Sequence, residues 1–213
     1  MSPSKSRRRR LHKKKNNNKK IIMIVALVAV ATVAIVGYVT LGNNSSSNSS
    51  NDNLPTTNKV MLVTSLGNIK IELRDDMPIT TNNFKRLVQQ GVYNDTIFHR
   101  VIAGFMIQGG DPTGTGYGDP SIPNIKDEFT DNNKNERGTI AMANTGVPNS
   151  GSSQFFINVV NNSNEGFDGD YPVFGKVIEG IDVVDTIAGV EVDVEANYRP
   201  VEPVILIVAE FVD

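Results

Sequence analysis

The feature that most constrains this chain is an apolar run of 21 residues without a charge, Ile21–Leu41, whose sequence is IIMIVALVAVATVAIVGYVTL. As a helix rising 1.5 Å per residue it would be about 31 Å long, which matches the roughly 30 Å hydrocarbon core of a bilayer. Thr32 and Thr40 can bond to the helix backbone, and Tyr38 lies near one end, where aromatic rings suit the membrane interface. The run therefore predicts a transmembrane helix.

Charge is distributed unevenly around this run. Residues 1–20 contain ten of the 21 Lys and Arg and no acid, which leaves 11 basic residues beside all 23 Asp and Glu. Basic residues that flank a membrane helix mark its cytoplasmic side. We therefore expect a single-pass membrane protein with a basic cytoplasmic tail over residues 1–20, a signal-anchor helix over 21–41, and the rest of the chain outside the cytoplasm.

Two other interpretations of the N-terminal segment stay open. Ala29-Val30-Ala31 has the small-x-small pattern of a signal-peptide cleavage site, but cleavage there would leave the apolar residues 32–41 on the mature protein. A basic run can also bind nucleic acid. Because the basic run directly precedes the apolar run, we favour an uncleaved anchor and expect no nucleic-acid partner.

Residues 42–58, GNNSSSNSSNDNLPTTN, are rich in Asn and Ser and carry a single charge, Asp52. Such a segment has too few apolar groups to offset the entropy of a packed structure, so we expect a flexible linker with a reach of about 20–25 Å. Residues 59–213 then form one domain, which is long enough to bury its own core.

The pattern of this domain is one of short strands separated by turns. Val60–Thr64 and Asn68–Leu73 alternate around Ser65-Leu66-Gly67, which predicts a hairpin. Further strand-like runs are Thr96–Val101, Phe105–Gln108, Thr139–Met142, Phe155–Val159, Val173–Val177 and Val204–Phe211.

Two helices are expected between these strands. The first is capped by Thr80 or Thr81, carries apolar residues at helical spacing from Phe84, and ends at Gly91. The second covers Asp182–Ala188. Many short strands with two helices favour a closed antiparallel barrel, which leaves no strand edge exposed.

The residue types exclude several chemistries. The chain has no cysteine, so disulfides and thiolate sites are absent, and the domain has one histidine, His99. The glycine-rich run 109–118 lacks the Lys-[Ser/Thr] ending of a phosphate-binding loop. The segment after Asp131 begins like a calcium loop but has Glu136 where that loop needs glycine. We therefore expect neither a metal nor a cofactor.

A different set of residues, one permanent cation with amides and large apolar side chains, falls in alternating strands. The segments are FHRVIAGFMIQGGD at 98–111, MAN at 142–144, SSQFFI at 152–157 and VFGKV at 173–177. Alternation would place Arg100 on the opposite face from Val101, and Phe105 opposite Met106. From spacing alone, a functional surface and a plain core with one surface arginine are about equally good interpretations.

These segments, in this order, resemble the signature of cyclophilin-type peptidyl-prolyl cis-trans isomerases, and the resemblance covers essentially all of residues 59–213. It implies a mainly β fold, a closed eight-stranded antiparallel barrel capped by two helices, preceded here by the transmembrane helix and the flexible linker. It also implies isomerisation of X-Pro bonds in proline-containing polypeptides without a cofactor. We expect a monomer, attached to the membrane through its N-terminal helix.

The resemblance implies a catalytic role for Arg100, supported by Gln108. The further substrate-binding residues that it implies, from the apolar floor outward, are Phe105, Met106, Phe156, Ala143, Asn144, Gln154, Phe167, Tyr171 and Gly114. The chain departs from the family at two places. Gly166-Phe167 stands where a Trp-Leu pair is common, and Tyr171 stands where some members have histidine.

The expected reaction suits this residue set. Twisting an X-Pro bond restores the lone pair of the prolyl nitrogen, and a guanidinium donor at that point stabilises the twisted state more than the planar one. The alternative is a membrane-tethered module or chaperone that binds proline-containing segments, with catalysis incidental. Retention of Arg100 and Gln108 favours the enzyme.

Overall fold

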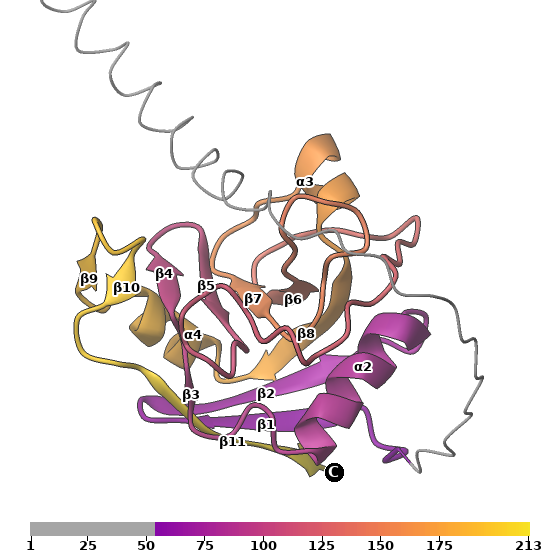
Figure 1. Cartoon of the computed structure of the whole chain (residues 1–213), viewed down its shortest axis with the longest axis horizontal. Helices are drawn as coiled ribbons and strands as arrows, with labels where there is room; N and C mark the ends of the chain where they lie inside the picture. The colour runs from indigo at the N-terminus through magenta and orange to yellow at the C-terminus, as the bar shows by residue number, and fades with distance from the viewer. Residues whose placement is uncertain (1–53) are drawn as a thin grey trace, which may run out of the picture. The chain divides into compact units, whose positions relative to one another are not determined.

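The computed structural model describes residues 54–213 (Figure 1). The predicted basic tail, the predicted membrane helix and most of the linker lie outside the described residues. Within residues 54–213, no helix has both the length and the apolar character needed to cross a bilayer.

The described chain consists mainly of short strands, with three helices among its residues 54–213. In chain order the elements are β1 (Lys59–Thr64), β2 (Gly67–Leu73), α2 (Pro78–Gln89), β3 (Thr96–Ile97), β4 (Arg100–Ile102), β5 (Met106–Gly109), β6 (Thr139–Met142), β7 (Phe155–Asn158), α3 (Glu165–Asp170), β8 (Val173–Glu179), α4 (Ile181–Ala188), β9 (Val192–Asp193), β10 (Arg199–Pro200) and β11 (Ile205–Val212). The predicted hairpin, the strand at Thr139–Met142 and the helix at 182–188 are confirmed.

Nine of these strands form one antiparallel sheet in the order β3-β11-β1-β2-β8-β6-β7-β5-β4, and β9 pairs with β10 separately. β3 and β4 lie at opposite ends of the order, yet only Phe98 and His99 separate them in sequence. The sheet must therefore curl until its two ends come within reach of two residues. Figure 1 shows this curvature, with α2 lying beside β1 and β2.

The observed sheet differs from the predicted closed, eight-stranded barrel. Within residues 54–213 it has nine strands, no ladder joins β3 to β4, and α3 is a third helix. The run expected as one strand over Thr96–Val101 is divided into β3 and β4. The division falls at Phe98 and His99: the N–H of Phe98 still donates to the C=O of Val204 at 3.0 Å, beside β11, whereas Arg100 pairs with Gln108 of β5. The fold is thus a curled antiparallel half-barrel.

The start of α2 also differs from the prediction. The helix begins at Pro78, so Thr80 and Thr81 lie inside it rather than at its cap, and the cap residue Met77 makes no side-chain cap bond. The first free N–H groups, of Ile79 and Thr80, donate instead to the carboxylate of Glu128 at 3.2 and 3.1 Å. A distant acid therefore performs the capping that sequence assigned to a local threonine.

The core fills the inside of the curled sheet. It includes Phe84, Leu87 and Val88 from α2, Val184 and Ile187 from α4, and alternate residues of the strands. This inner face fixes the register of each strand, because a shift by one residue would turn its core side chains outward. The strand residues that alternate with these core residues therefore face outward, and the strand register determines which of them are neighbours.

Candidate active site

The outward-facing residues of four neighbouring strands form a row across the sheet. Strand register pairs Arg100 of β4 with Gln108 of β5, Gln108 with Phe156 of β7, and Phe156 with Ala141 of β6. Their sequence neighbours Val101, Ile107, Ile157 and Ile140 belong to the core. The predicted alternation of Arg100 with Val101 is thereby confirmed, and the row brings a cation, an amide and an aromatic ring side by side.

A second apolar cluster, here called the pocket cluster, lies on this outward face and is separate from the core. Its members are Met106, Ala141, Ala143, Phe156 and Val173, with Ile102, Phe105, Phe167 and Tyr171 packed against it. Of the predicted floor, Met106 and Phe156 are buried and Phe105 is partly exposed. The structure thus brings the predicted apolar residues together without merging them into the core.

Four aromatic rings form one wall of the pocket cluster. The ring centroids of Phe167 lie 5.7 Å from Phe105, 5.8 Å from Phe156 and 4.6 Å from Tyr171. Phe156 and Tyr171 are 5.4 Å apart with rings at 83°. Edge-to-face contacts of this kind hold rings in fixed relative orientation. Phe167 and Tyr171, the two positions that depart from the family, therefore pack against each other and against the floor.

Arg100 is largely enclosed but only partly hydrogen-bonded. Its Nη1 donates to Oε1 of Gln108 at 3.5 Å, while its buried Nε has no partner in the described part of the chain. Burial lowers the pKa of Arg100, and the phenols of Tyr171 and Tyr198 act in the opposite direction. An arginine remains protonated at neutral pH even so. The site therefore holds a charged donor with unused bonding capacity.

The amide of Gln108 continues into a chain of hydrogen bonds. Its Nε2 donates to Oε1 of Gln154 at 2.9 Å, and Nε2 of Gln154 donates to the C=O of Gly116 at 3.1 Å. The backbone C=O of Gln154 accepts from the N–H of Ala143 at 3.0 Å. Predicted residues from three segments are thus connected.

Asn144 and Gly114, the two remaining predicted residues, lie at the margin. Nδ2 of Asn144 donates to the C=O of Asp170 at 2.7 Å, and its Oδ1 accepts from the N–H of Gly146 at 2.9 Å. Gly114 is held by other neighbours, since its C=O accepts from Arg199 at 2.8 Å. Among the described residues, Gly116 rather than Gly114 is the loop glycine bonded to the predicted site.

Sequence reasoning missed a buried polar network behind the aromatic wall, here called the asparagine network. Its members are Asn133, Asn135, Asn158, Asn162 and Asp168. Asn133 and Asn135 both donate to the C=O of Tyr171, at 3.0 and 3.1 Å, and Asn162 donates to the C=O of Phe105 at 2.9 Å. The network therefore fixes the backbone at both ends of the wall. The sequence did contain one sign of this network: the apolar strand Phe155–Asn158 ends in an asparagine.

The carboxylate of Asp168 is the centre of this network. It accepts from the N–H of Asn135 at 2.8 Å, from the hydroxyl of Ser163 at 2.6 Å and from Nζ of Lys134 at 3.2 Å. Burial by itself raises the pKa of Asp168, but these hydrogen bonds outweigh it and the pKa lies below its usual range. Asp168 is thus an ionised structural anchor for α3, which carries Phe167.

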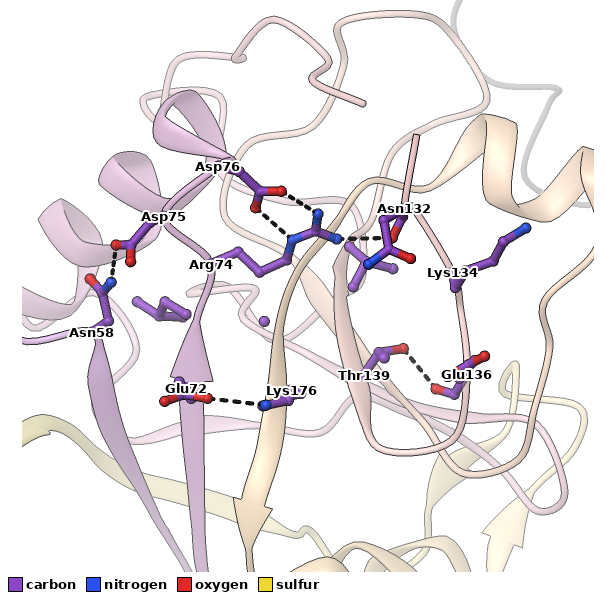
Figure 2. A pocket seen from close by; sticks show the side chains of 13 residues that line it. Asn58, Glu72, Arg74, Asp75, Asp76, Asn132, Lys134, Glu136, Thr139 and Lys176 are labelled. Carbon is purple, nitrogen blue, oxygen red and sulfur yellow. Dashed lines mark hydrogen bonds and ion pairs between the residues drawn. The ribbon is translucent and has the colours of Figure 1, made fainter. Parts of the chain in front are cut away.

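A groove of about 570 Å³ lies elsewhere on the surface (Figure 2). Two ion pairs lie within it, Arg74 with Asp76 at 2.6 Å and Lys176 with Glu72 at 3.2 Å, and its Lys134 pairs with Asp168 outside it. None of the predicted site residues is among the described residues that line it, although Val173 belongs both to its lining and to the pocket cluster. The groove lacks an apolar floor and an unpaired cation, so it does not fit a proline ring beside a free donor.

No group of three or more His, Asp or Glu side chains within residues 54–213 is placed to hold a metal ion. The outward face offers an apolar floor beside a charged hydrogen-bond donor.

Comparisons with known proteins identify the family of the chain. The family described as "Cyclophilin type peptidyl-prolyl cis-trans isomerase/CLD" matches residues 59–210. "Peptidyl-prolyl cis-trans isomerase A" of Dickeya dadantii is 41% identical over 157 residues, covering 71% of this chain and 83% of the relative. "Peptidyl-prolyl cis-trans isomerase-like 3" of Dictyostelium discoideum is 49% identical over 138 residues, covering 63% and 84%.

A solved structure extends the likeness to the fold. The cyclophilin-type isomerase of Cryptosporidium parvum, crystallised in the presence of the dipeptide Ala-Pro, is 34% identical with a TM-score of 0.65. The match covers 73% of this chain and 99% of that one. The family match and these relatives show a peptidyl-prolyl cis-trans isomerase. The chain belongs to the cyclophilin family.

Proposed function

We propose that this isomerase catalyses rotation about X-Pro bonds at the pocket cluster, with Arg100 as the catalytic donor and Gln108 as its support. The observation that carries the proposal is the buried Nε of Arg100, which has no partner among the described residues although it lies beside an apolar floor. An unbonded charged donor is costly in a folded protein unless something binds to it.

The proposed mechanism uses the electronic change of the amide. Resonance keeps the X-Pro bond planar, with a barrier of about 18–20 kcal/mol. In the twisted state the prolyl nitrogen regains its lone pair, and Arg100 donates to it. Since the planar ground state has no such acceptor, the bond stabilises the transition state selectively.

The magnitudes are compatible with this mechanism. Raising the rate from ~0.01 to ~10 per second requires about 4 kcal/mol. A hydrogen bond from a charged donor supplies roughly 1.5–3 kcal/mol. Transfer of the amide to an apolar floor weakens its charge-separated resonance form and supplies the remainder.

The apolar side chains and the backbone groups among the other predicted residues are proposed to bind the substrate. Phe105, Met106 and Phe156 would receive the proline ring, with the ring of Phe167 as the adjoining wall. The backbone of Asn144 would hold the extended substrate chain, with Ala143 beside it. The Cryptosporidium parvum relative, crystallised in the presence of the dipeptide Ala-Pro, supports a proline-containing peptide as the class of ligand.

The proposed clients are extracytoplasmic or secreted proteins, reached from a membrane anchor. The basic residues 1–20 followed by the apolar residues 21–41 support an N-terminus in the cytoplasm and a catalytic domain outside it. The linker would hold the domain close to the membrane while leaving it free to turn.

The test of the proposed mechanism is Arg100→Ala, assayed by protease-free exchange spectroscopy on an X-Pro peptide. We expect an unchanged fold and a loss in kcat/KM of about 100-fold, because the transition-state hydrogen bond is gone. Arg86→Ala, on the exterior of α2, is the control for loss of an arginine. If kcat/KM of Arg100→Ala stays within twofold of the parent, the role of Arg100 is refuted. If the parent itself binds the peptide but does not isomerise it, the binding-module alternative is favoured.

A further inference from the structure

Asp111 is a buried carboxylate that lies outside the proposed substrate contacts. Its Oδ1 accepts from the N–H and the hydroxyl of Thr113 at 2.9 and 2.8 Å. Its Oδ2 accepts from the N–H groups of Gly116 and Gly118 at 2.6 and 3.2 Å. The side chain of Asp111, which is 0% exposed, thus holds the turn at residues 113–118 in place by hydrogen bonds.

The charge of Asp111 is maintained by these bonds. Burial alone would raise the pKa of Asp111, but the hydrogen bonds from Thr113, Gly116 and Gly118 outweigh burial and lower it. The carboxylate is therefore ionised at neutral pH and acts purely as an acceptor.

The turn presents one carbonyl toward the site. Gly116 has φ of 88°, a conformation that side-chain-bearing residues rarely adopt, and a Cβ there would lie 3.2 Å from Cδ2 of His99. With its N–H held by Asp111, Gly116 directs its C=O to Nε2 of Gln154 at 3.1 Å. A carbonyl can only accept, so Gln154 must present its NH₂ group at this point.

The orientation of Gln154 determines that of Gln108. With its NH₂ group on Gly116, Gln154 presents its Oε1 to Nε2 of Gln108 at 2.9 Å. Gln108 then presents its own Oε1 to Nη1 of Arg100 at 3.5 Å. If either amide were reversed, an NH₂ group would face the guanidinium and both would be donors.

We propose that Asp111 is a positioning residue, which sets the direction of the Gln154 and Gln108 amides and thereby holds Arg100 in its catalytic orientation. The proposal rests on the proposed role of Arg100. It assigns no substrate contact to Asp111, so the expected effect of losing the carboxylate falls on kcat rather than on KM.

The first test is Asp111→Asn in the purified full-length chain in mild detergent. Whichever oxygen position the new NH₂ group takes, it meets an N–H donor, of Thr113 or of Gly116 and Gly118, so the turn that carries the Gly116 carbonyl loses part of its anchor. We expect kcat on an X-Pro peptide to fall about tenfold, with KM within about twofold of the parent. The matched control is Asp119→Asn, since Asp119 accepts from the N–H of Ser121 in the adjoining turn and has no bond to the amides. The control should keep the parental kcat.

The second test measures whether the side chain at position 154 must donate to Gly116. It does not depend on the stability of the Asp111 variant. In Gln154→Glu, a protonated carboxyl can donate to Gly116 and accept from Gln108, whereas an ionised one can only accept. The kcat of this variant, divided by that of the parent at the same pH, should rise about fivefold or more from pH 7.5 to pH 5.

The groups facing this position are His99, Asp111, Arg100 and Arg199. Because His99 interacts with the side chain at position 154, the variant and its parent are compared with His99→Gln in both, so that no imidazole titrates at this position. A ratio that does not change with pH overturns the proposal, as does an Asp111→Asn enzyme that folds and keeps its kcat or loses only KM. An active Arg100→Ala variant would instead refute the proposed catalytic role of Arg100, on which the positioning role of Asp111 rests.

Discussion

His99 and Arg100 are adjacent in the chain, and each has a buried nitrogen without a hydrogen-bond partner among the described residues. Nδ1 of His99 and Nε of Arg100 are both buried without a partner among the described residues. The two side chains differ in the consequence. A guanidinium keeps its charge and remains a donor, whereas a buried imidazole becomes neutral. Only Arg100 therefore qualifies as a charged donor for a substrate nitrogen.

The first residue-level prediction concerns stability against pH. Burial lowers the pKa of His99 to about 4, and the nearby Asp111 acts in the opposite direction. Between about pH 4 and 6.5 the unfolded chain binds a proton that the folded chain does not, so the free energy of unfolding falls as the pH is lowered. The expected loss is about 2 kcal/mol between pH 7.5 and 5, measured by urea unfolding.

The control for this prediction is His99→Gln, which removes the titrating group from the same buried position. Its free energy of unfolding should change less over the same pH interval than that of the parent. Equal slopes for the two proteins would show that His99 is not the source. Asp111 and Asp168, whose pKa values are lowered, lose their contribution only at more acidic pH and do not obscure the interval.

At the scale of elements, the site depends on loops that are fastened to strands by polar side chains. α3 has six residues and cannot be stable by itself. Its position is set by Asp168, which bonds to Asn135 and Lys134 of a distant loop. The aromatic wall is thus positioned by buried hydrogen bonds more than by the helix that carries part of it.

Asn135→Ala tests this dependence. Asn135 is 0% exposed, and its side chain bonds to Asp168, to the C=O of Tyr171 and to Asn158. Its removal leaves buried polar groups without partners, so we expect a loss of about 2–3 kcal/mol in the free energy of unfolding. We also expect a raised KM for an X-Pro peptide, because Tyr171 and Phe167 lose their fixed position.

The matched control is Asn132→Ala in the same loop. Asn132 is exposed in the groove of Figure 2, and its backbone C=O, which the substitution retains, accepts from Arg74. This variant should remain within about 0.5 kcal/mol of the parent. If both variants lose the same stability, the loss comes from the loop as a whole and the role assigned to the network is wrong.

At the scale of the whole molecule, the beginning and the end of the described domain meet. Oγ1 of Thr57 donates to the C=O of Val212 at 2.8 Å, and β1 pairs along its full length with β11. The linker therefore joins the domain beside its C-terminal strand. Arg100 lies on β4, at one end of the sheet order, whereas β1 and β11 are neighbours near the other end.

The prediction at this scale concerns the membrane. If residues 21–41 form an uncleaved anchor, the full-length protein should remain in the membrane pellet after an alkaline carbonate wash, since about 20 apolar residues hold it in the hydrocarbon core. A version with Ala26, Val30 and Ile35 changed to Asp is the control and should be released. Recovery of a soluble parental form beginning near residue 32 or 42 would show that the segment is cleaved.

Local patterns in the sequence were sufficient for the hairpin, for α4 and for the alternation of Arg100 with Val101. These features depend on contacts between residues near one another in the chain, so period and turn chemistry predict them. The cap of α2 was predicted wrongly for the complementary reason. Its acceptor, Glu128, lies 49 residues beyond Ile79, and no local pattern indicates it.

The sequence by itself determined the family, the division into an apolar N-terminal run and a strand-rich domain, and the residue types of the site. Only the tertiary structure decided that Met106 and Phe156 lie outside the core, that Asp168 anchors the aromatic wall, and that Gly116 rather than Gly114 bonds to Gln154. The physical reason is that side-chain identity and period are properties of the chain, whereas the direction of a hydrogen bond depends on which distant group meets it after the sheet has curled.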